Sequence, residues 1–87
     1  MKLKANDNVL RVIARSPFHV FYEGDAKMVS AANPVGKFDI LPGHADFFSI
    51  LIPSEVTIET DKDVISFNIS NGIISVMGEE IILFVNM

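Results

Sequence analysis

The stretch VISFNISNGIISVM, residues 64–77, carries the clearest structural signal in the chain. From Ile65 to Ser70, apolar residues alternate strictly with serine or asparagine, which is the two-residue period of a half-buried β-strand. Asn71 and Gly72 then interrupt the pattern, and both residue types tolerate the positive φ angles that a type I′ two-residue turn requires. The stretch therefore predicts two antiparallel strands joined as a hairpin.

The same kind of pattern extends outward over the rest of the chain, where short β-branched and aromatic runs alternate with turn residues and helical periodicity is nearly absent. In the segment Leu41-Pro42-Gly43-His44, proline presets φ at the second position and glycine permits a positive φ at the third. This predicts a type II turn that projects His44 past a tight corner. The predicted strands cover residues 9–15, 20–23, 27–32, 37–41, 47–52, 55–60, 64–70, 73–77 and 81–86. Such a series predicts an all-β fold, a flattened antiparallel sandwich or barrel.

Composition narrows the class of protein further. The 87 residues are enough for one domain, which we expect to span 1–87. A net charge of −4 argues against nucleic-acid binding, and the absence of cysteine excludes disulfides and thiolate metal sites. No segment approaches the roughly 20 apolar residues of a membrane helix, and the basic start is followed by polar residues, unlike a signal peptide. We therefore expect a soluble protein that reaches a membrane only through a partner.

Two of the predicted strands are apolar on both faces. Residues 47–52 read FFSILI, and residues 81–85 read IILFV. A sandwich strand normally has one face in the core and one in water, so a second apolar face suggests a surface for another protein. The alternative is that strand tilt and edge coverage bury both faces within the domain. The residues expected on the partner face are Phe48, Ile50, Ile82 and Phe84.

Side chains with catalytic or metal-binding chemistry are few. His44 and Asp46 could form an acid–base pair, which keeps a small enzyme open as an alternative. No nucleophile or second base is identifiable nearby, so a contact role for His44 is favoured. His19 opens an apolar strand and is more typical of a strand edge than of a metal site. We predict no catalytic, cofactor-binding or metal-binding residue.

The segment GKFDILPGHA, residues 36–45, resembles the Gly-x-Phe-Gly-x-Leu-Pro-Gly-His-Ala stretch of the epsilon subunit of bacterial F-type ATP synthases, the delta subunit in mitochondria. The opening strands around Ser16-Pro17 and the stretch 69–76 are similar to the corresponding parts of that family. Leu51-Ile52-Pro53 resembles the family's Leu-x-Pro-Gly, with Ser54 at the glycine. The resemblance covers residues 9–85.

This resemblance implies a flattened β-sandwich of about ten strands without cofactor. It implies a non-catalytic central-stalk subunit of the rotary proton-translocating ATP synthase, which couples the c-ring to the gamma subunit at the cytoplasmic face of the cell membrane. By position, the residues in contact with the rotor ring would be Lys37, Asp39, Gly43 and His44.

The chain departs from the family pattern in two respects. Asp39 stands where glycine is usual, and Lys37 stands where an acidic residue is common, which would change the charge pairing with ring loops. The two C-terminal helices usual in the family are expected to be absent, so ATP binding and helix-mediated inhibition are not carried over. These departures keep a second possibility open, a stand-alone β-sandwich interaction module of another assembly.

Overall fold

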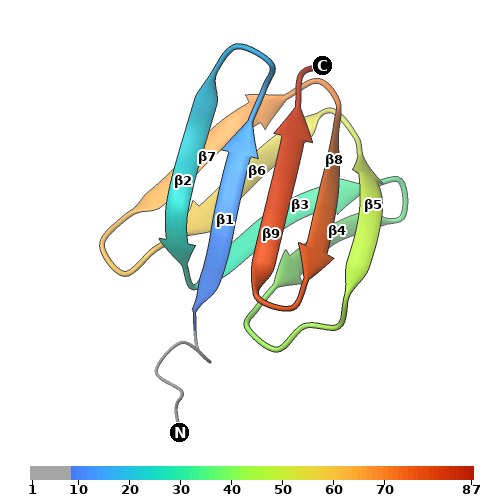
Figure 1. Ribbon diagram of the computed structural model, residues 1–87. Helices are drawn as coiled ribbons and strands as arrows, with labels where there is room; N and C mark the ends of the chain where they lie inside the picture. Colours follow the sequence, from blue (N-terminus) through green and yellow to red (C-terminus); the bar gives the residue numbers. More distant parts are fainter. Residues whose placement is uncertain (1–8) are drawn as a thin grey trace, which may run out of the picture.

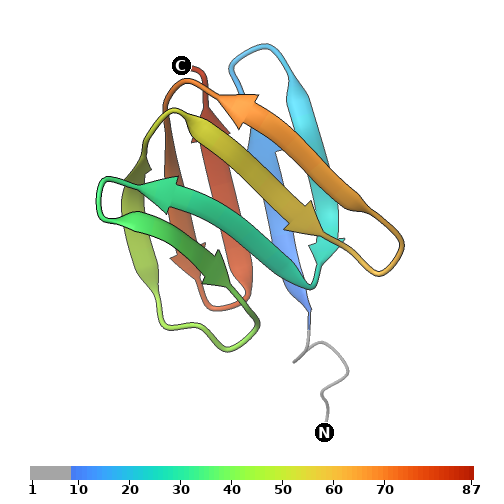
Figure 2. The same ribbon diagram turned by 180° about the vertical axis from the view of Figure 1, so that it is seen from behind.

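A computed structural model describes residues 9–87; residues 1–8, which belong to the expected 1–87 domain and to the signal-peptide argument, lie outside the described part. Two sheets face each other as the layers of a sandwich (Figures 1 and 2). The strands of residues 9–87 are β1 (Leu10–Arg15), β2 (Val20–Ala26), β3 (Met28–Asn33), β4 (Gly36–Ile40), β5 (Phe47–Leu51), β6 (Ser54–Glu59), β7 (Val64–Ile69), β8 (Gly72–Met77) and β9 (Glu80–Val85). The all-β sandwich prediction is confirmed.

The two sheets differ in topology. Sheet A has the strand order β2-β1-β9-β8-β5, and sheet B has the order β4-β3-β6-β7. The prediction of a wholly antiparallel sandwich was wrong at one place, because β1 and β9 run parallel, with Val12 opposite Ile81 and Ala14 opposite Leu83. Alternation of apolar and polar residues is the same in parallel and antiparallel strands, so it carries no information on direction. The described residues contain nine strands rather than about ten.

The predicted hairpin at Asn71-Gly72 was also wrong. Strand β7 pairs with β6 in sheet B, whereas β8 pairs with β5 and β9 in sheet A. The chain therefore crosses from one sheet to the other at this point, and Gly72 does not have a positive φ. Glycine is needed for space instead, since a Cβ at Gly72 would lie 2.8 Å from Cγ1 of Val85.

The asparagine of this crossing holds the end of β9. The backbone N–H of Asn86 donates to the carbonyl of Asn71 at 2.9 Å, and the N–H of Met87 donates to the Asn71 side-chain oxygen at 3.1 Å. Ser70 donates its backbone N–H to the side-chain oxygen of Asn86 at 2.8 Å. The crossing and the last strand are thus tied together by polar groups of both.

The core lies between the two sheets and is aliphatic. Strands β1 and β9 alternate strictly between buried and exposed residues, as a half-buried strand must. The largest fully buried side chains are Leu10, Val12, Val29, Ile40, Val56, Ile58, Ile74, Val76, Ile81, Leu83 and Val85. Burying each such side chain contributes about 1.5–3 kcal/mol. No buried side-chain nitrogen or oxygen in the described part lacks a hydrogen-bond partner.

Aromatic side chains close both open sides of the sandwich. On the side of β2 and β7, Phe21 and Phe67 stack with ring centroids 4.4 Å apart. On the side of β4 and β5, Phe38 and Phe47 meet edge to face at 5.2 Å. Aromatic pairs of this kind add about 0.5–1.5 kcal/mol beyond their burial. The edges of the two sheets are therefore fixed to each other, which makes the sandwich a single packed block.

Candidate protein-interaction site

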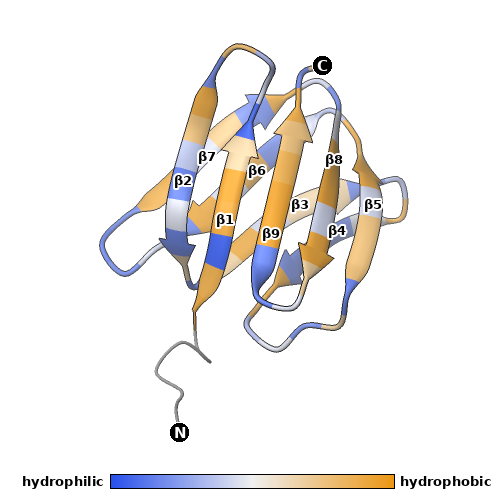
Figure 3. Cartoon of the chain, viewed as in Figure 1, coloured by the Kyte–Doolittle hydropathy of each residue, from blue (hydrophilic) through white to orange (hydrophobic). Residues whose placement is uncertain are grey.

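The outer face of sheet A is apolar although it faces solvent. Figure 3 shows hydrophobic residues along most of β9, β8 and β5. Ile82 of β9 lies between Ile13 of β1 and Ser75 of β8, and Ser75 in turn lies opposite Phe48 of β5. The next row joins Phe84, Ile73 and Ile50 in the same way. We call this surface the apolar face; it consists of Ile13, Phe48, Ile50, Ile73, Met77, Ile82 and Phe84.

The four residues predicted for a partner face all lie on this surface and are exposed: Phe48, Ile50, Ile82 and Phe84. The alternative, that both faces of these strands are buried within the domain, is therefore wrong. Sequence reasoning missed Ile13, Ile73 and Met77, because their membership depends on strand pairing. A contiguous exposed apolar surface of this kind is typical of a protein–protein contact.

The outer face of sheet B is polar by contrast. The hydroxyl of Ser30 donates to a carboxylate oxygen of Asp39 at 2.5 Å across β3 and β4. The hydroxyls of Thr57 and Ser66 lie 3.2 Å apart across β6 and β7. Polar cross-strand pairs of this type are compatible with direct contact with water. The two outer faces of the sandwich thus suit different environments.

The loop 41–46 between β4 and β5 forms the predicted tight turn. The N–H of His44 donates to the carbonyl of Leu41 at 3.1 Å, and Gly43 has a φ of 88°. A type II turn has this hydrogen bond between its fourth and first residues, and it requires a positive φ at its third residue. His44 is exposed, with Nδ1 2.8 Å from the carbonyl oxygen of Ala45 and its ring 5.8 Å from that of Phe47. The imidazole is therefore held at the surface beside the aromatic pair.

Asp46 fixes this loop to the neighbouring turn. Its side-chain oxygen accepts a hydrogen bond of 2.8 Å from the N–H of Gly78, in the turn between β8 and β9. Gly78 has a φ of 63°, which L-residues other than glycine rarely adopt. The structure thus gives both His44 and Asp46 backbone partners, rather than pairing them with each other as acid and base.

Removing the Asp46 carboxylate should loosen the loop. We expect Asp46→Ala to lower the free energy of unfolding by about 1–2 kcal/mol, because a hydrogen bond to a charged acceptor is lost at a solvent-exposed site. Urea denaturation followed by circular dichroism measures this. Asp46→Asn keeps an oxygen acceptor and should lose less, and Asp61→Ala serves as a control within about 0.5 kcal/mol. Equal stability of Asp46→Ala and Asp61→Ala would contradict the assigned bond.

The other two predicted ring-contact residues come from the edge strand β4. Lys37 and Asp39 are both exposed and alternate with Phe38, which turns inward to Phe47. Strand β4 leads directly into the loop of Gly43 and His44, so all four residues lie along one continuous segment. Ser30, which sequence reasoning missed, orients the Asp39 carboxylate through the bond described above. No local pattern in the sequence could have indicated that partner.

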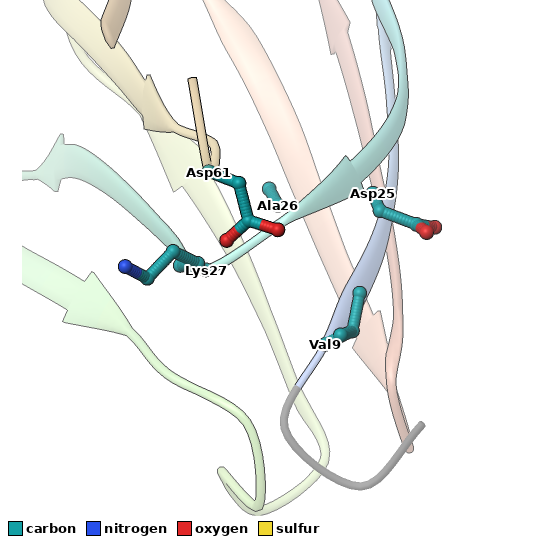
Figure 4. A pocket seen from close by; sticks show the side chains of 5 residues that line it. All are labelled: Val9, Asp25, Ala26, Lys27 and Asp61. Atoms are coloured by element: carbon teal, nitrogen blue, oxygen red, sulfur yellow. The ribbon is translucent and has the colours of Figure 1, made fainter. Parts of the chain in front are cut away.

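His44 lines neither of two open hollows on the described surface. One of about 60 Å³ is lined by Val9, Asp25, Ala26, Lys27 and Asp61, and Figure 4 shows the Lys27 and Asp25 side chains pointing apart. A wider one of about 460 Å³ is lined by Val9, Arg11, Asp25, Met77, Gly78, Glu79 and Glu80. Small-molecule sites are usually enclosed, which neither hollow is.

Titration and metal binding offer little further chemistry. Desolvation by burial, together with the Asp25 carboxylate, raises the pKa of Tyr22, whose hydroxyl donates to the Asp25 carbonyl. No group of three His, Cys, Asp or Glu side chains in residues 9–87 is placed to hold a metal ion. Over the same residues, we find no helix with the length and apolarity needed to cross a bilayer. The fold and its surfaces define a small β-sandwich domain with one apolar and one polar outer face.

Comparison with known proteins shows to which family this β-sandwich domain belongs. The family model described as ATP synthase, Delta/Epsilon chain, beta-sandwich domain matches residues 9–87. The chain belongs to this family, whose members are non-catalytic subunits of ATP synthase. The family resemblance seen in the sequence is thereby confirmed.

Individual relatives agree with this assignment. The ATP synthase epsilon chain of Ruminococcus albus is 37% identical over 73 residues, which cover 84% of this chain and 53% of the relative. That of Ruthia magnifica is 43% identical over 63 residues, covering 72% and 46%. The chain thus spans about half the length of the curated relatives it matches.

Solved structures share the fold at low sequence identity. A chain of the Euglena gracilis mitochondrial ATP synthase matches with a TM-score of 0.84 at 13% identity, over 92% of this chain and 52% of that one. A chain from the central stalk and c-ring of the Tetrahymena thermophila mitochondrial ATP synthase matches with a TM-score of 0.75 at 15% identity, over 87% and 62%. At such identities the likeness concerns the fold alone.

Proposed function

We propose that this chain is the β-sandwich part of a central-stalk subunit that couples the c-ring of a rotary, proton-translocating ATP synthase to its gamma subunit. Family membership supports the complex, and the apolar face is the single observation that carries the coupling role. The chain performs no catalysis in this role. It would lie at the cytoplasmic face of the cell membrane, held there by the complex.

The apolar face is the surface we assign to gamma. Its exposed side chains from β1, β5, β8 and β9 offer contiguous apolar area, and burial of such area is worth roughly 25 cal/mol per Å² before association costs. The polar outer face of sheet B offers no comparable gain. A partner that covers sheet A would therefore leave sheet B in water.

The segment from β4 through the loop 41–46 is the surface we assign to the ring. Lys37, Asp39, Gly43 and His44 are all exposed there. Charged and polar groups fit a contact with polar loops, and such contacts determine partner choice and association rate more than affinity. Between the two surfaces lies a close-packed core, which resists compression and transmits strain. The domain can thus pass torque from one partner to the other as a rigid body.

The direct test is purification of a tagged chain from its native cell. We expect gamma and c subunits to be recovered together with it, in amounts that exceed those from a tag-only control. Recovery of a different assembly instead would contradict the proposal and support a stand-alone interaction module.

The ring contact is tested by His44→Ala and Asp39→Lys. Each should weaken retention on detergent-solubilised c-ring about 5- to 20-fold without unfolding the domain, because both side chains are exposed. Quantitative pull-down measures the retention, and circular dichroism confirms the fold. Glu55→Lys is the matched control, since it reverses a charge on the same sheet outside the assigned segment. If all three variants bind the ring like the unaltered chain, the ring assignment is wrong.

A further inference from the structure

The turn between β1 and β2 presents a phenylalanine almost wholly to solvent. Phe18 is 97% exposed, the largest exposed fraction among the large hydrophobic side chains of residues 9–87. A phenyl group in water forgoes about 2–3 kcal/mol that burial would supply. Single exposed apolar residues are common on proteins, so exposure alone assigns nothing to Phe18. The hydrogen bonds within the turn supply a second observation about Phe18.

Hydrogen bonds fix the backbone of Phe18 in place. Ser16, the one buried polar residue of the described part, donates its N–H to the carbonyl of His19 at 2.8 Å. Its hydroxyl oxygen accepts the N–H of Phe18 at 3.4 Å. Pro17 restricts φ between them. The turn thus holds Phe18 in one backbone conformation before any partner arrives.

The Arg15 side chain also forms hydrogen bonds with the backbone of this turn. Nε donates to the carbonyl of Ser16 at 3.0 Å, and Nη2 donates to the carbonyl of Pro17 at 3.3 Å. A guanidinium has five N–H donors, so others remain free at this exposed site. Within residues 9–87 the recorded ion pair joins Arg11 to Asp25, and the segment 15–20 contains no carboxylate. Arg15 therefore offers, next to the turn of Phe18, a positive charge that is not ion-paired with any carboxylate of residues 9–87.

This turn continues the apolar face. Arg15 lies opposite Val20 in β2 and opposite Phe84 in β9, and both of those side chains are exposed. Figure 1 shows the turn at the end of sheet A where the chain also ends. A partner that covers the apolar face would thus reach Arg15 and the turn of Phe18 by extending along β1 and β9.

We propose that Phe18 is an anchor residue that enters an apolar pocket on the protein covering the apolar face, with a carboxylate at the pocket rim that pairs with Arg15. This inference rests on the proposed function. Interface hot spots are enriched in aromatic residues and arginine, and an anchor fixed beforehand loses little conformational entropy on binding. Insertion into a membrane is disfavoured by the chain's net charge of −4, since cytoplasmic lipid surfaces are negative.

The test measures affinity of the whole chain for its cognate, co-expressed gamma subunit. We expect Phe18→Ser to weaken binding at least about 30-fold, as for a hot-spot residue, with unchanged unfolding in urea. Val35→Ser is the matched control, because Val35 is 95% exposed in the turn between β3 and β4, and it should stay within about twofold. Arg15→Gln should weaken binding less and reduce its dependence on salt.

Three outcomes would overturn the inference. Equal affinities of Phe18→Ser and Val35→Ser would show that Phe18 is not an anchor. If Phe84→Ser weakens gamma binding while Phe18→Ser does not, the anchor is refuted and the proposed function stands; if neither does, both fail. The third outcome concerns lipid and is measured as binding to vesicles of phosphatidylcholine and phosphatidylglycerol. Loss of vesicle binding on Phe18→Ser, with gamma binding unchanged, would assign Phe18 to lipid.

Discussion

Leu83→Ala should lower the free energy of unfolding by about 3–4 kcal/mol, within the range measured for buried leucines. Leu83 is fully buried in β9, the central strand of sheet A. It lies between Ala14 of β1 and Ile74 of β8, and the small alanine beside it cannot fill the cavity that the change leaves. Sandwich packing around a central strand leaves little freedom to collapse, so the loss should lie above the lower end of that range.

The stability lost in Leu83→Ala is large relative to the total stability of the domain. A domain of 87 residues has a total stability on the order of 5–10 kcal/mol, so Leu83→Ala should remove about a third or more of it. The melting temperature should fall by about 15–25 °C, measurable by calorimetry. Met77→Ala, at an exposed position of β8, is the control and should stay within about 0.5 kcal/mol. A loss below 1 kcal/mol at Leu83 would mean that β9 does not lie at the centre of the core.

The strands could be predicted from the sequence because their signals are local. The alternation along residues 65–69 assigns its apolar members to the interior, and the structure places Ile69 in the core with Ile65 and Phe67 packed against it. Strand pairing is not local. The parallel contact of β1 with β9 joins the first and last strands of the fold, and nothing within either strand indicates it.

Gly72 shows how a correct residue-level signal can lead to a wrong structure. Asn-Gly is a strong hairpin signal because both residues accept positive φ. Here the glycine is required by Val85, which lies opposite it in the paired strand β9 and leaves no room for a Cβ. Gly72 is therefore needed for a close contact between strands and not for a positive φ of its own. The chain crosses between the sheets at the position where a hairpin was expected.

The candidate site was predictable in part for the same reason. Phe48, Ile50, Ile82 and Phe84 belong to strands that are apolar on both faces, which is visible in each strand by itself. Ile13 is different, because it joins the apolar face only through its register with Ile82. The bond from Gly78 to Asp46 spans 32 residues, so the spacing of His44 and Asp46 suggested a pair that the structure does not form.

The centre of the apolar face is the place where one substitution should have the largest effect on assembly. Ile82 is 48% exposed, lies on the central strand β9, and has Ile13 and Ser75 on either side. Ile82→Glu would place a carboxylate in the middle of the contact. Burying an unpaired charge is strongly unfavourable, and truncating or unpairing a buried charge at an interface typically costs 3–5 kcal/mol.

We therefore expect Ile82→Glu to weaken binding to the cognate gamma subunit at least about 100-fold, since about 1.4 kcal/mol corresponds to a factor of ten. Thr57→Glu is the matched control, because Thr57 lies on the outer face of β6, an inner strand of sheet B, and its neighbours are polar. Both variants place the same charge on an inner strand, so a general loss of stability would affect them alike. Isothermal titration calorimetry with gamma separates the two, because only the variant on sheet A should lose binding. Should Thr57→Glu weaken binding as much as Ile82→Glu, gamma would have to contact sheet B, and the assignment of the two faces would be reversed.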